Sequence, residues 1–350
     1  MKKTITEQRL SNILIPILAL SILSLTIVPA FAHEAWALGA PMPTHREGYG
    51  AAVISYLQTI YYVDGYNASY GNMEIVEAYN VSTNTWTTGL ADDLVTRAEL
   101  AAVSNGTHVF AVGGRYGTAV LDDLTMYDPI ADDWTTLASM PTPAVTEHCV
   151  AYHGGAIYVA GGRAIPEPPL STYTWTSDPV LDTLQMYNIT ENTWYTLASL
   201  PISIGDGALV SKGNKLFLVG GWTGAFDGPW YTPDWLDTIY VYDIDEDTWT
   251  LSTTQLDTAR ADVAAAVAGN RLYAIGGYTG TSTTTTVEVF TITGKGIKSS
   301  RDGPDLLYPT AEAQGVYTGG RIFVAGGGYR GVPPVPSGVL QILDTQQGGP

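Results

Sequence analysis

Residues 33–45 read HEAWALGAPMPTH, and the string returns as DDWTTLASMPTPA at 132–144 and, more loosely, as NTWYTLASLPISI at 192–204. In the two later copies, a segment with a tyrosine comes just before the tryptophan. In the first copy, only an apolar leader comes before it. The chain after the leader therefore begins with the last quarter of a repeating unit. The rest of that unit has to come from another part of the sequence.

Pairs of glycines mark the repeat. Each pair follows a short run of β-forming residues, as in VFAVGG and LFLVGG, and the copies recur every 48 to 59 residues. The pairs are Gly113 and Gly114, Gly161 and Gly162, Gly220 and Gly221, Gly276 and Gly277, and Gly326 and Gly327. A degenerate first copy, IYYVDG, ends at Gly65. A period near 50 with this punctuation predicts an all-β propeller rather than a helical solenoid.

Each unit continues with a tyrosine and, seven residues later, a tryptophan, as at Tyr127 and Trp134. Together with the glycine pairs, this pattern resembles the kelch-repeat family over nearly all of the chain after the leader. Repeat five departs from it, with Phe290 and Ile297 at the two positions. Glycine lets neighbouring backbones approach closely, and the aromatic rings fill the space between blades. We interpret the repeat tryptophans as structural: Trp36, Trp86, Trp134, Trp194 and Trp249.

The sixth repeat is incomplete. It has its glycine pair and the segment GVLQILD at 338–344, but no fourth strand. Trp36 stands in for its missing tryptophan, and APMPT at 40–44 matches ASMPT at 138–142. Pairing the N-terminal strand with the last blade would close the ring and leave no exposed sheet edge there. We therefore predict a six-bladed kelch-type β-propeller closed by an N-terminal strand.

The predicted propeller spans residues 33–344. Residues 33–42 supply the outer strand of blade 6, and residues 345–350 form a C-terminal tail. The blades are expected to start near residues 43, 91, 141, 200, 253 and 306.

The first 32 residues are typical of a signal peptide. Lys2 and Lys3 precede an apolar stretch at 13–28, and Ala30 and Ala32 place small residues where a signal peptidase reads. We predict cleavage after Ala32 and a secreted or cell-surface protein. The alternative is an uncleaved membrane anchor, because residues 13–32 are just long enough to span a bilayer.

The charge balance limits the classes of partner. The net charge of the full chain is −18, and loss of a leader of charge +2 takes it to −20. Such a surface repels nucleic acid and anionic membrane, and it suits cationic partners or metal ions. Cys149 is the only cysteine, so no intrachain disulfide can form. Four sequons could carry sugar if the host glycosylates: Asn67, Asn80, Asn105 and Asn188.

A carboxylate recurs 14 residues before the first glycine of each pair: Glu99, Glu147, Asp206, Asp262 and Glu312. Repeat one has Gly50 instead. In kelch propellers this point opens the innermost strand of each blade, so the resemblance implies five carboxylates near one rim of the central channel. Two interpretations stay open: each acid bonds backbone amides and locks adjacent blades, or the ring binds a cation or polar ligand.

Two arginines lie two residues before ring positions, Arg97 before Glu99 and Arg260 before Asp262. Because residues i and i+2 share a face of a strand, we expect these pairs to neutralise each other. Uncharged residues precede the other three acids, which should lack a local partner. Oxygen-only ligands favour Ca²⁺, so we predict a calcium site at Glu147, Asp206 and Glu312.

Repeats three and four carry long aromatic insertions at 163–180 and 222–235. They hold the four tryptophans outside the repeat position: Trp175, Trp222, Trp230 and Trp235. In an antiparallel meander, these connections lie on the same face as the carboxylates. Aromatic rings beside acids suit a sugar-binding surface. The alternative is that the loops pack on each other as a lid and bind no ligand.

We favour an exported binding module that uses this face for a carbohydrate, cation or protein partner. Nothing in the sequence demands catalysis. A second reading is a sugar-acting enzyme, because exported sialic-acid mutarotases are also six-bladed kelch proteins. A channel with Glu99, Arg97, Asp262 and Arg260 would be compatible with acid–base work. A third reading is a passive cell-surface scaffold.

Overall fold

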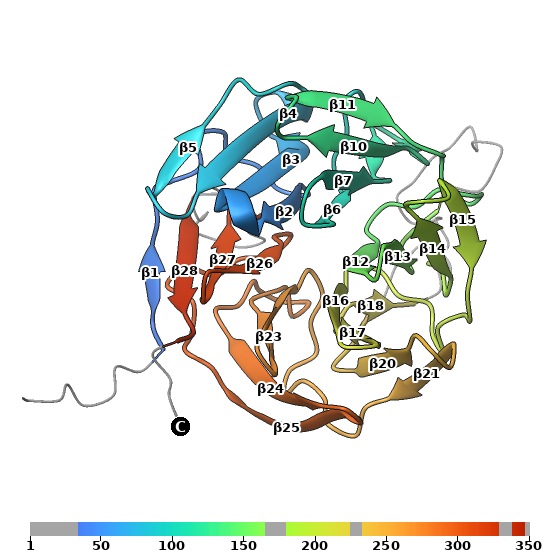
Figure 1. The fold of residues 1–350 in the computed structure, drawn as a ribbon. Helices are drawn as coiled ribbons and strands as arrows, with labels where there is room; N and C mark the ends of the chain where they lie inside the picture. Colours follow the sequence, from blue (N-terminus) through green and yellow to red (C-terminus); the bar gives the residue numbers. More distant parts are fainter. Residues whose placement is uncertain (1–33, 165–179, 225–232, 329–337, 347–350) are drawn as a thin grey trace, which may run out of the picture.

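The computed structural model describes residues 34–164, 180–224, 233–328 and 338–346. These residues form six four-stranded antiparallel sheets around a central axis, so the predicted six-bladed β-propeller is confirmed (Figure 1). The described residues contain no α-helix, and their one helical turn is the 3-10 element η1 (Ser55–Leu57). No helix in this part of the chain is long and apolar enough to cross a membrane.

Each blade runs from an innermost strand at the axis to an outermost strand at the rim. Blade 1 comprises β2 (Gly50–Ile54), β3 (Thr59–Asn67), β4 (Gly71–Asn80) and β5 (Thr85–Thr87). Blade 2 comprises β6 (Ala101–Ser104), β7 (Val109–Val112), β10 (Leu124–Asp128) and β11 (Asp133–Thr136). Blade 3 comprises β12 (Cys149–His153), β13 (Ala156–Ala160), β14 (Leu184–Asn188) and β15 (Thr193–Thr196).

The second half of the ring has the same order. Blade 4 comprises β16 (Ala208–Lys212), β17 (Lys215–Val219), β20 (Ile239–Asp243) and β21 (Thr248–Leu251). Blade 5 comprises β22 (Ala264–Ala268), β23 (Arg271–Ile275), β24 (Val287–Thr293) and β25 (Gly296–Asp302). Blade 6 comprises β26 (Gly315–Thr318), β27 (Arg321–Ala325), β28 (Leu340–Asp344) and β1 (Trp36–Leu38). Two short hairpins project from blades 2 and 4: β8 (Arg115–Tyr116) with β9 (Ala119–Val120), and β18 (Trp222–Thr223) with β19 (Asp234–Trp235).

The N-terminal strand closes the ring. β1 pairs antiparallel with β28, with Trp36 opposite Leu343 (Figure 1). Just after β1, the Ala40 N–H donates to Asn84 Oδ1 at 2.7 Å, and Ala40 O accepts from Trp86 Nε1 at 2.8 Å. The same short segment is therefore a strand of blade 6 and a hydrogen-bonding partner of blade 1, which joins the last blade to the first.

The repeat tyrosine and tryptophan hold neighbouring blades together. In blade 2, Trp134 Nε1 donates to Ala91 O at 3.0 Å, and its ring lies 5.2 Å from that of Tyr127. Asp132 accepts from both the Tyr127 hydroxyl (2.6 Å) and the Ala91 N–H (2.9 Å). Equivalent bonds from the other repeat tryptophans reach the preceding blade at Trp36, Trp86, Trp194 and Trp249.

The apolar core lies between blades and not at the axis. The cluster between blades 1 and 2, for example, contains Val63, Leu100, Ala111 and Tyr127, all buried. Similar clusters fill the other interfaces. Each blade buries both of its faces against its neighbours, and an open channel remains at the axis, lined mainly by small apolar residues of the innermost strands and by carboxylates.

Candidate functional site

The central channel is a cavity of about 410 Å³, and the innermost strands of all six blades line it. The five repeated carboxylates also line it, each two or three residues before the start of an innermost strand: Glu99, Glu147, Asp206, Asp262 and Glu312. They therefore gather at one end of the channel. We call this end of the propeller the acid face and the other end the opposite face.

We call Gly48 and the five carboxylate residues the ring positions, and backbone hydrogen bonds join them in a row from Gly48 to Asp262. The N–H of Glu99 donates to Gly48 O (2.6 Å), that of Glu147 to Glu99 O (3.3 Å), that of Asp206 to Glu147 O (2.9 Å) and that of Asp262 to Asp206 O (2.8 Å). All five carboxylate residues and Gly48 have φ between 50° and 57°, which turns each N–H toward the neighbouring blade. Backbone atoms thus join the blades at these positions, and the Glu99 carboxylate adds a side-chain contact, because Oε2 accepts from Thr146 Oγ1 of blade 3 at 3.3 Å.

Gly48, not Gly50, is the blade 1 member of this ring. The hairpin of β2 and β3 is two residues longer than that of β6 and β7, since Gly50 pairs with Val63 whereas Ala101 pairs with Val112. A fixed count of 14 residues therefore misplaces the position in repeat one. Because a glycine serves the backbone ring there, the side chain is not needed for it, and five carboxylates at the other positions call for a different explanation.

Each ring acid lies beside the residue that follows the glycine pair of its own blade. Isolated bridges join the two segments in all six blades, as at Ala98 with Arg115 and Thr146 with Arg163. This pairing places the connections between strands two and three on the acid face, as the meander argument requires. Side chains from these connections, at the first residue after the glycine pair, contact three of the ring acids.

Two of the partners are arginines and one is a tryptophan. Arg115 binds Glu99 through two short hydrogen bonds, and Arg163 Nη1 lies 2.8 Å from Glu147 Oε1. Trp222 Nε1 donates to Asp206 Oδ2 at 2.8 Å. The prediction that Glu147 and Asp206 lack a local partner is therefore wrong. The partner follows the glycine pair in sequence, a position that the sequence argument did not consider.

Burial and crowding of like charges act on the ring. Burial, with Asp206 and Glu99 nearby, raises the pKa of Glu147 well above its ordinary value despite the attraction of Arg163. Burial and the neighbouring Asp262 likewise raise the pKa of Asp206, and the hydrogen bond from Trp222 opposes this only in part. Ionisation of these two carboxyl groups is therefore unfavourable, and a cationic group in the channel mouth would stabilise their charged forms.

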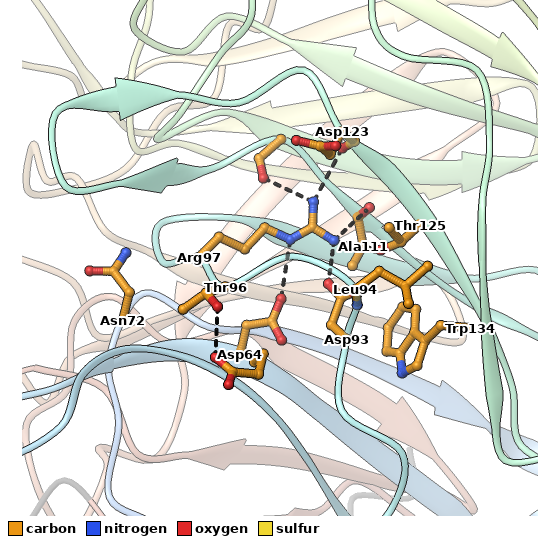
Figure 2. A network of polar contacts seen from close by, with 12 residues as sticks. Asp64, Asn72, Asp93, Leu94, Thr96, Arg97, Ala111, Asp123, Thr125 and Trp134 are labelled. Carbon is orange, nitrogen blue, oxygen red and sulfur yellow. Dashed lines mark hydrogen bonds and ion pairs between the residues drawn. The ribbon is translucent and has the colours of Figure 1, made fainter.

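The predicted pairs of Arg97 with Glu99 and of Arg260 with Asp262 do not form. Arg97 has no exposed surface and lies between blades, where its Nε is 3.1 Å from Asp64 Oδ2 and its Nη2 is 2.5 Å from Asp93 Oδ2 (Figure 2). Arg260 is equally buried and binds Glu288 at 2.5 Å. The i, i+2 argument fails because the left-handed conformation at each ring position breaks the alternation of the strand.

A third buried arginine, Arg46, was not predicted from the sequence. Arg46 lies two residues before Gly48 and binds Glu77 through Nη2 at 2.6 Å, with both side chains buried. Correct alignment of the longer first hairpin would have revealed it as the equivalent of Arg97 and Arg260. Arg97 and Arg260 have no exposed surface and cannot contact a ligand in the channel, so the structure does not support their predicted role in ligand binding or acid–base work.

The aromatic insertions are only partly described. Trp175 and Trp230 lie outside the described residues. Trp222 is only 5% exposed, and its indole N–H donates to Asp206. Its ring is therefore not accessible for stacking on a sugar. Trp235 is half-buried and meets the Tyr278 ring edge-on, with centroids 5.2 Å apart.

The remaining candidates are placed as follows. Among the described residues, no three His, Cys, Asp or Glu side chains are grouped so as to hold a metal ion, and the calcium prediction stays a prediction. Cys149 is buried, and burial raises the pKa of its thiol. Asn67 lies at the tip of the β3–β4 hairpin on the acid face, whereas the other three sequons lie in hairpins of the opposite face: Asn80, Asn105 and Asn188.

The sequence matches two models of kelch repeats and several kelch-like proteins. The family model described as "KLHDC2/KLHL20/DRC7 Kelch-repeats domain" matches residues 32–221, and the "Kelch motif" model matches 206–254 and 259–294. Kelch-like protein 38 of Rattus norvegicus is 27% identical over 246 residues, which cover 69% of this chain and 37% of the relative.

Two further relatives give the same picture. Kelch-like protein 23 of Homo sapiens is 28% identical over 247 residues, covering 69% of this chain and 39% of the relative. Kelch-like protein terF of Aspergillus terreus is 24% identical over 273 residues, covering 74% of this chain and 55% of the relative. The chain thus spans between about two fifths and just over half of the length of these relatives.

Proposed function

Because the chain belongs to the kelch-repeat family, we propose that it is a binding module that holds a protein partner on its acid face through positively charged groups of that partner. The kelch β-propeller is typically a protein-binding module. The observation that carries the proposal is the way in which charge is divided between the two faces of the propeller.

Positive charge is scarce on the acid face. Three of its described arginines are fully buried, namely Arg46, Arg97 and Arg260, and the other two, Arg115 and Arg163, bind ring carboxylates. All four lysines that follow the leader lie in or beside hairpins of the opposite face: Lys212, Lys215, Lys295 and Lys298. In the part of the chain that the structure describes, the acid face therefore carries mostly negative charge, and such a field attracts cationic partners and repels anionic ones.

The channel mouth supplies a specific target within that field. Five carboxylates meet there, and the pKa of two of them, Glu147 and Asp206, is raised by burial and by like charge. A lysine, an arginine or an N-terminal amine would gain most where several carboxylates share a site. This favours recognition of a basic protein segment over recognition of an anionic one.

The experiment is a selection from a random peptide display library against the protein expressed from its full sequence. We expect selected peptides to be rich in lysine and arginine and to lose binding to the triple variant Glu147→Gln, Asp206→Asn, Glu312→Gln. A matched control removes three acids of the opposite face: Asp133→Asn, Glu191→Gln, Glu246→Gln. Selected peptides without a positive bias, or equal loss with both triple variants, would contradict the proposal.

Export forms part of the proposal. It is supported by the leader at 1–32, which lies outside the described residues, and by the start of the closing strand at Trp36, four residues past the predicted cleavage site. The mass of the N-terminal peptide from exported protein tests it. Cleavage after Ala32 predicts a peptide that begins at His33, and a peptide that retains residues 13–32 would instead indicate an anchor.

Calcium and carbohydrate remain further proposals for the same face. A rise of the unfolding midpoint with Ca²⁺, lost in the ring triple variant, would support calcium, since a ligand of the folded state stabilises it by mass action. Carbohydrate binding would depend on Trp175 and Trp230, and a glycan screen with Trp175→Ala and Trp230→Ala tests it. The mutarotase-like alternative loses its support, because Arg97 and Arg260 lie outside the channel.

A further inference from the structure

Blades 1 and 2 carry exposed aromatic rings on the acid face. Tyr70 is 77% exposed at the turn between β3 and β4, and Tyr116 is 59% exposed in the β8–β9 hairpin. Tyr66 is 38% exposed on β3. Leaving large aromatic surface in water has a cost, and tyrosine is enriched where proteins meet partners. Aromatic loops were predicted only in repeats three and four, so these three tyrosines were not among the predicted site residues.

The hairpin that carries Tyr66 and Tyr70 is braced on both sides. Asn67 Nδ2 donates to His45 O at 2.6 Å, on the side of blade 6, and Asn72 Nδ2 donates to Arg115 O at 2.7 Å, on the side of blade 2. The second bond ties this hairpin directly to β8, in which Arg115 is followed by Tyr116. The rings are thus presented on a fixed backbone, so little conformational entropy is lost when a partner contacts them.

The surroundings of these rings are acidic. Asp92 is exposed in the connection between β5 and β6, and Asp122 is exposed between β9 and β10. Glu47 and Glu99 line a small cavity of about 100 Å³ together with Tyr66. The one arginine at this cavity, Arg115, is bound to Glu99. Aromatic faces next to carboxylates complement lysine and arginine side chains. The carboxylates attract the positive charge, and the rings contact the aliphatic chain and the charged group.

We propose that the tyrosine platform, made of Tyr66, Tyr70 and Tyr116, docks a lysine- or arginine-rich extended segment of a protein partner, with basic side chains stacked on the tyrosine rings. This inference rests on the proposed function, since it assigns part of the same face to the same kind of partner. The inference places the segment across the hairpins of blades 1 and 2. It also assigns part of the binding energy to contacts with the tyrosine rings in addition to charge.

Fluorescence anisotropy with a labelled twelve-residue peptide of alternating lysine and serine tests the platform, and a glutamate–serine peptide serves as the anionic control. Two cation–π contacts correspond to a loss of affinity between about 5- and 30-fold, which we expect for Tyr70→Ala with Tyr116→Ala. The matched control is Tyr56→Ala, a tyrosine that is 60% exposed in η1 on the opposite face and should leave the affinity unchanged. Unchanged urea midpoints establish that these exposed positions do not affect folding.

The outcomes separate this inference from the proposed function. If the lysine peptide binds, and the Tyr70 and Tyr116 variant matches Tyr56→Ala within twofold, the platform is refuted while the ring remains. If that variant loses binding and the ring triple variant does not, the platform stands without the ring. Preference for the glutamate peptide, or self-association of the wild type through the platform in sedimentation, would overturn the inference.

Discussion

Replacement of Arg97 by methionine tests whether the buried arginines hold the blades together. Arg97 contacts two carboxylates, Asp64 and Asp93 (Figure 2), and none of the three side chains has exposed surface. Its Nη2 also donates to Thr125 Oγ1 at 2.5 Å, and its Nη1 donates to the carbonyl of Gly113 at 3.2 Å. Methionine keeps much of the volume but leaves two buried carboxylates without a cation.

The magnitude follows from that geometry. Removing one partner of a buried ion pair typically costs about 3–5 kcal/mol, because the remaining charge stays out of water. Burial and Asp93 already raise the pKa of Asp64, and Arg97 is what opposes this rise. In Arg97→Met the folded-state pKa of Asp64 should rise further. A raised folded pKa contributes stability below the unfolded pKa that is lost as pH increases, so the deficit should grow from pH 5 to pH 8.

Urea unfolding at both pH values measures the effect, with Arg301→Met as the control. Arg301 also pairs with a carboxylate, Glu34 at 3.0 Å, but its side chain is 48% exposed, so its loss should cost less than about 1 kcal/mol. Adding Asp64→Asn and Asp93→Asn to Arg97→Met should restore at least half of the lost stability. The reasoning is refuted if Arg97→Met costs no more than Arg301→Met, or if its deficit does not change with pH.

Three further predictions concern closure, the ring and the repeat tyrosines. Trp36→Ala removes a tryptophan that is 6% exposed in the closing strand and should cost about 3–5 kcal/mol in urea unfolding; a midpoint like that of wild type would mean that β1 does not hold the ring closed. Because burial and Asp262 raise the pKa of Asp206, wild-type stability should fall as pH rises from about 4 through that raised pKa. Asp206→Asn should therefore gain thermal stability relative to wild type between pH 4.5 and pH 8, and parallel pH curves would argue against this. Tyr127→Phe and Tyr187→Phe each remove a hydroxyl bond of 2.6 Å and should cost about 1 kcal/mol each; the costs should add, because the bonds lie in different interfaces, and strong non-additivity in the double variant would show coupling between them.

The repeat could be predicted from sequence because each of its regularly spaced residues, the glycine pair, the tyrosine and the tryptophan, makes the same contact in blade after blade. The Trp134 indole, for example, donates to a carbonyl of the preceding blade, and an equivalent tryptophan does so in every blade except blade 5. The closing strand was predictable for the same reason, since Trp36 and Met42 match Trp134 and Met140 and are buried like them.

The partners of the carboxylates could not be predicted in this way. Counting along a strand assumes alternation, but Glu99 has a φ of 53°, and a single left-handed residue redirects the side chains before it. Arg97 therefore enters the blade interface, and Glu99 finds Arg115 sixteen residues later. Exposure of Tyr70 and Tyr116 likewise depends on how far two hairpins project, which the tyrosine content of the chain does not reveal.

The pairing of β1 with β28 also determines how the propeller responds to force. Trp36, at the start of β1, lies opposite Leu343, near the end of β28, so both ends of the chain leave the pair at the same edge. Tension applied between the two ends would load the rungs of this three-residue pairing one after another, in an unzipping geometry, instead of shearing them all at once. The closure should consequently be the first part to yield under a pull, at low force, while the five blades formed from continuous segments stay intact.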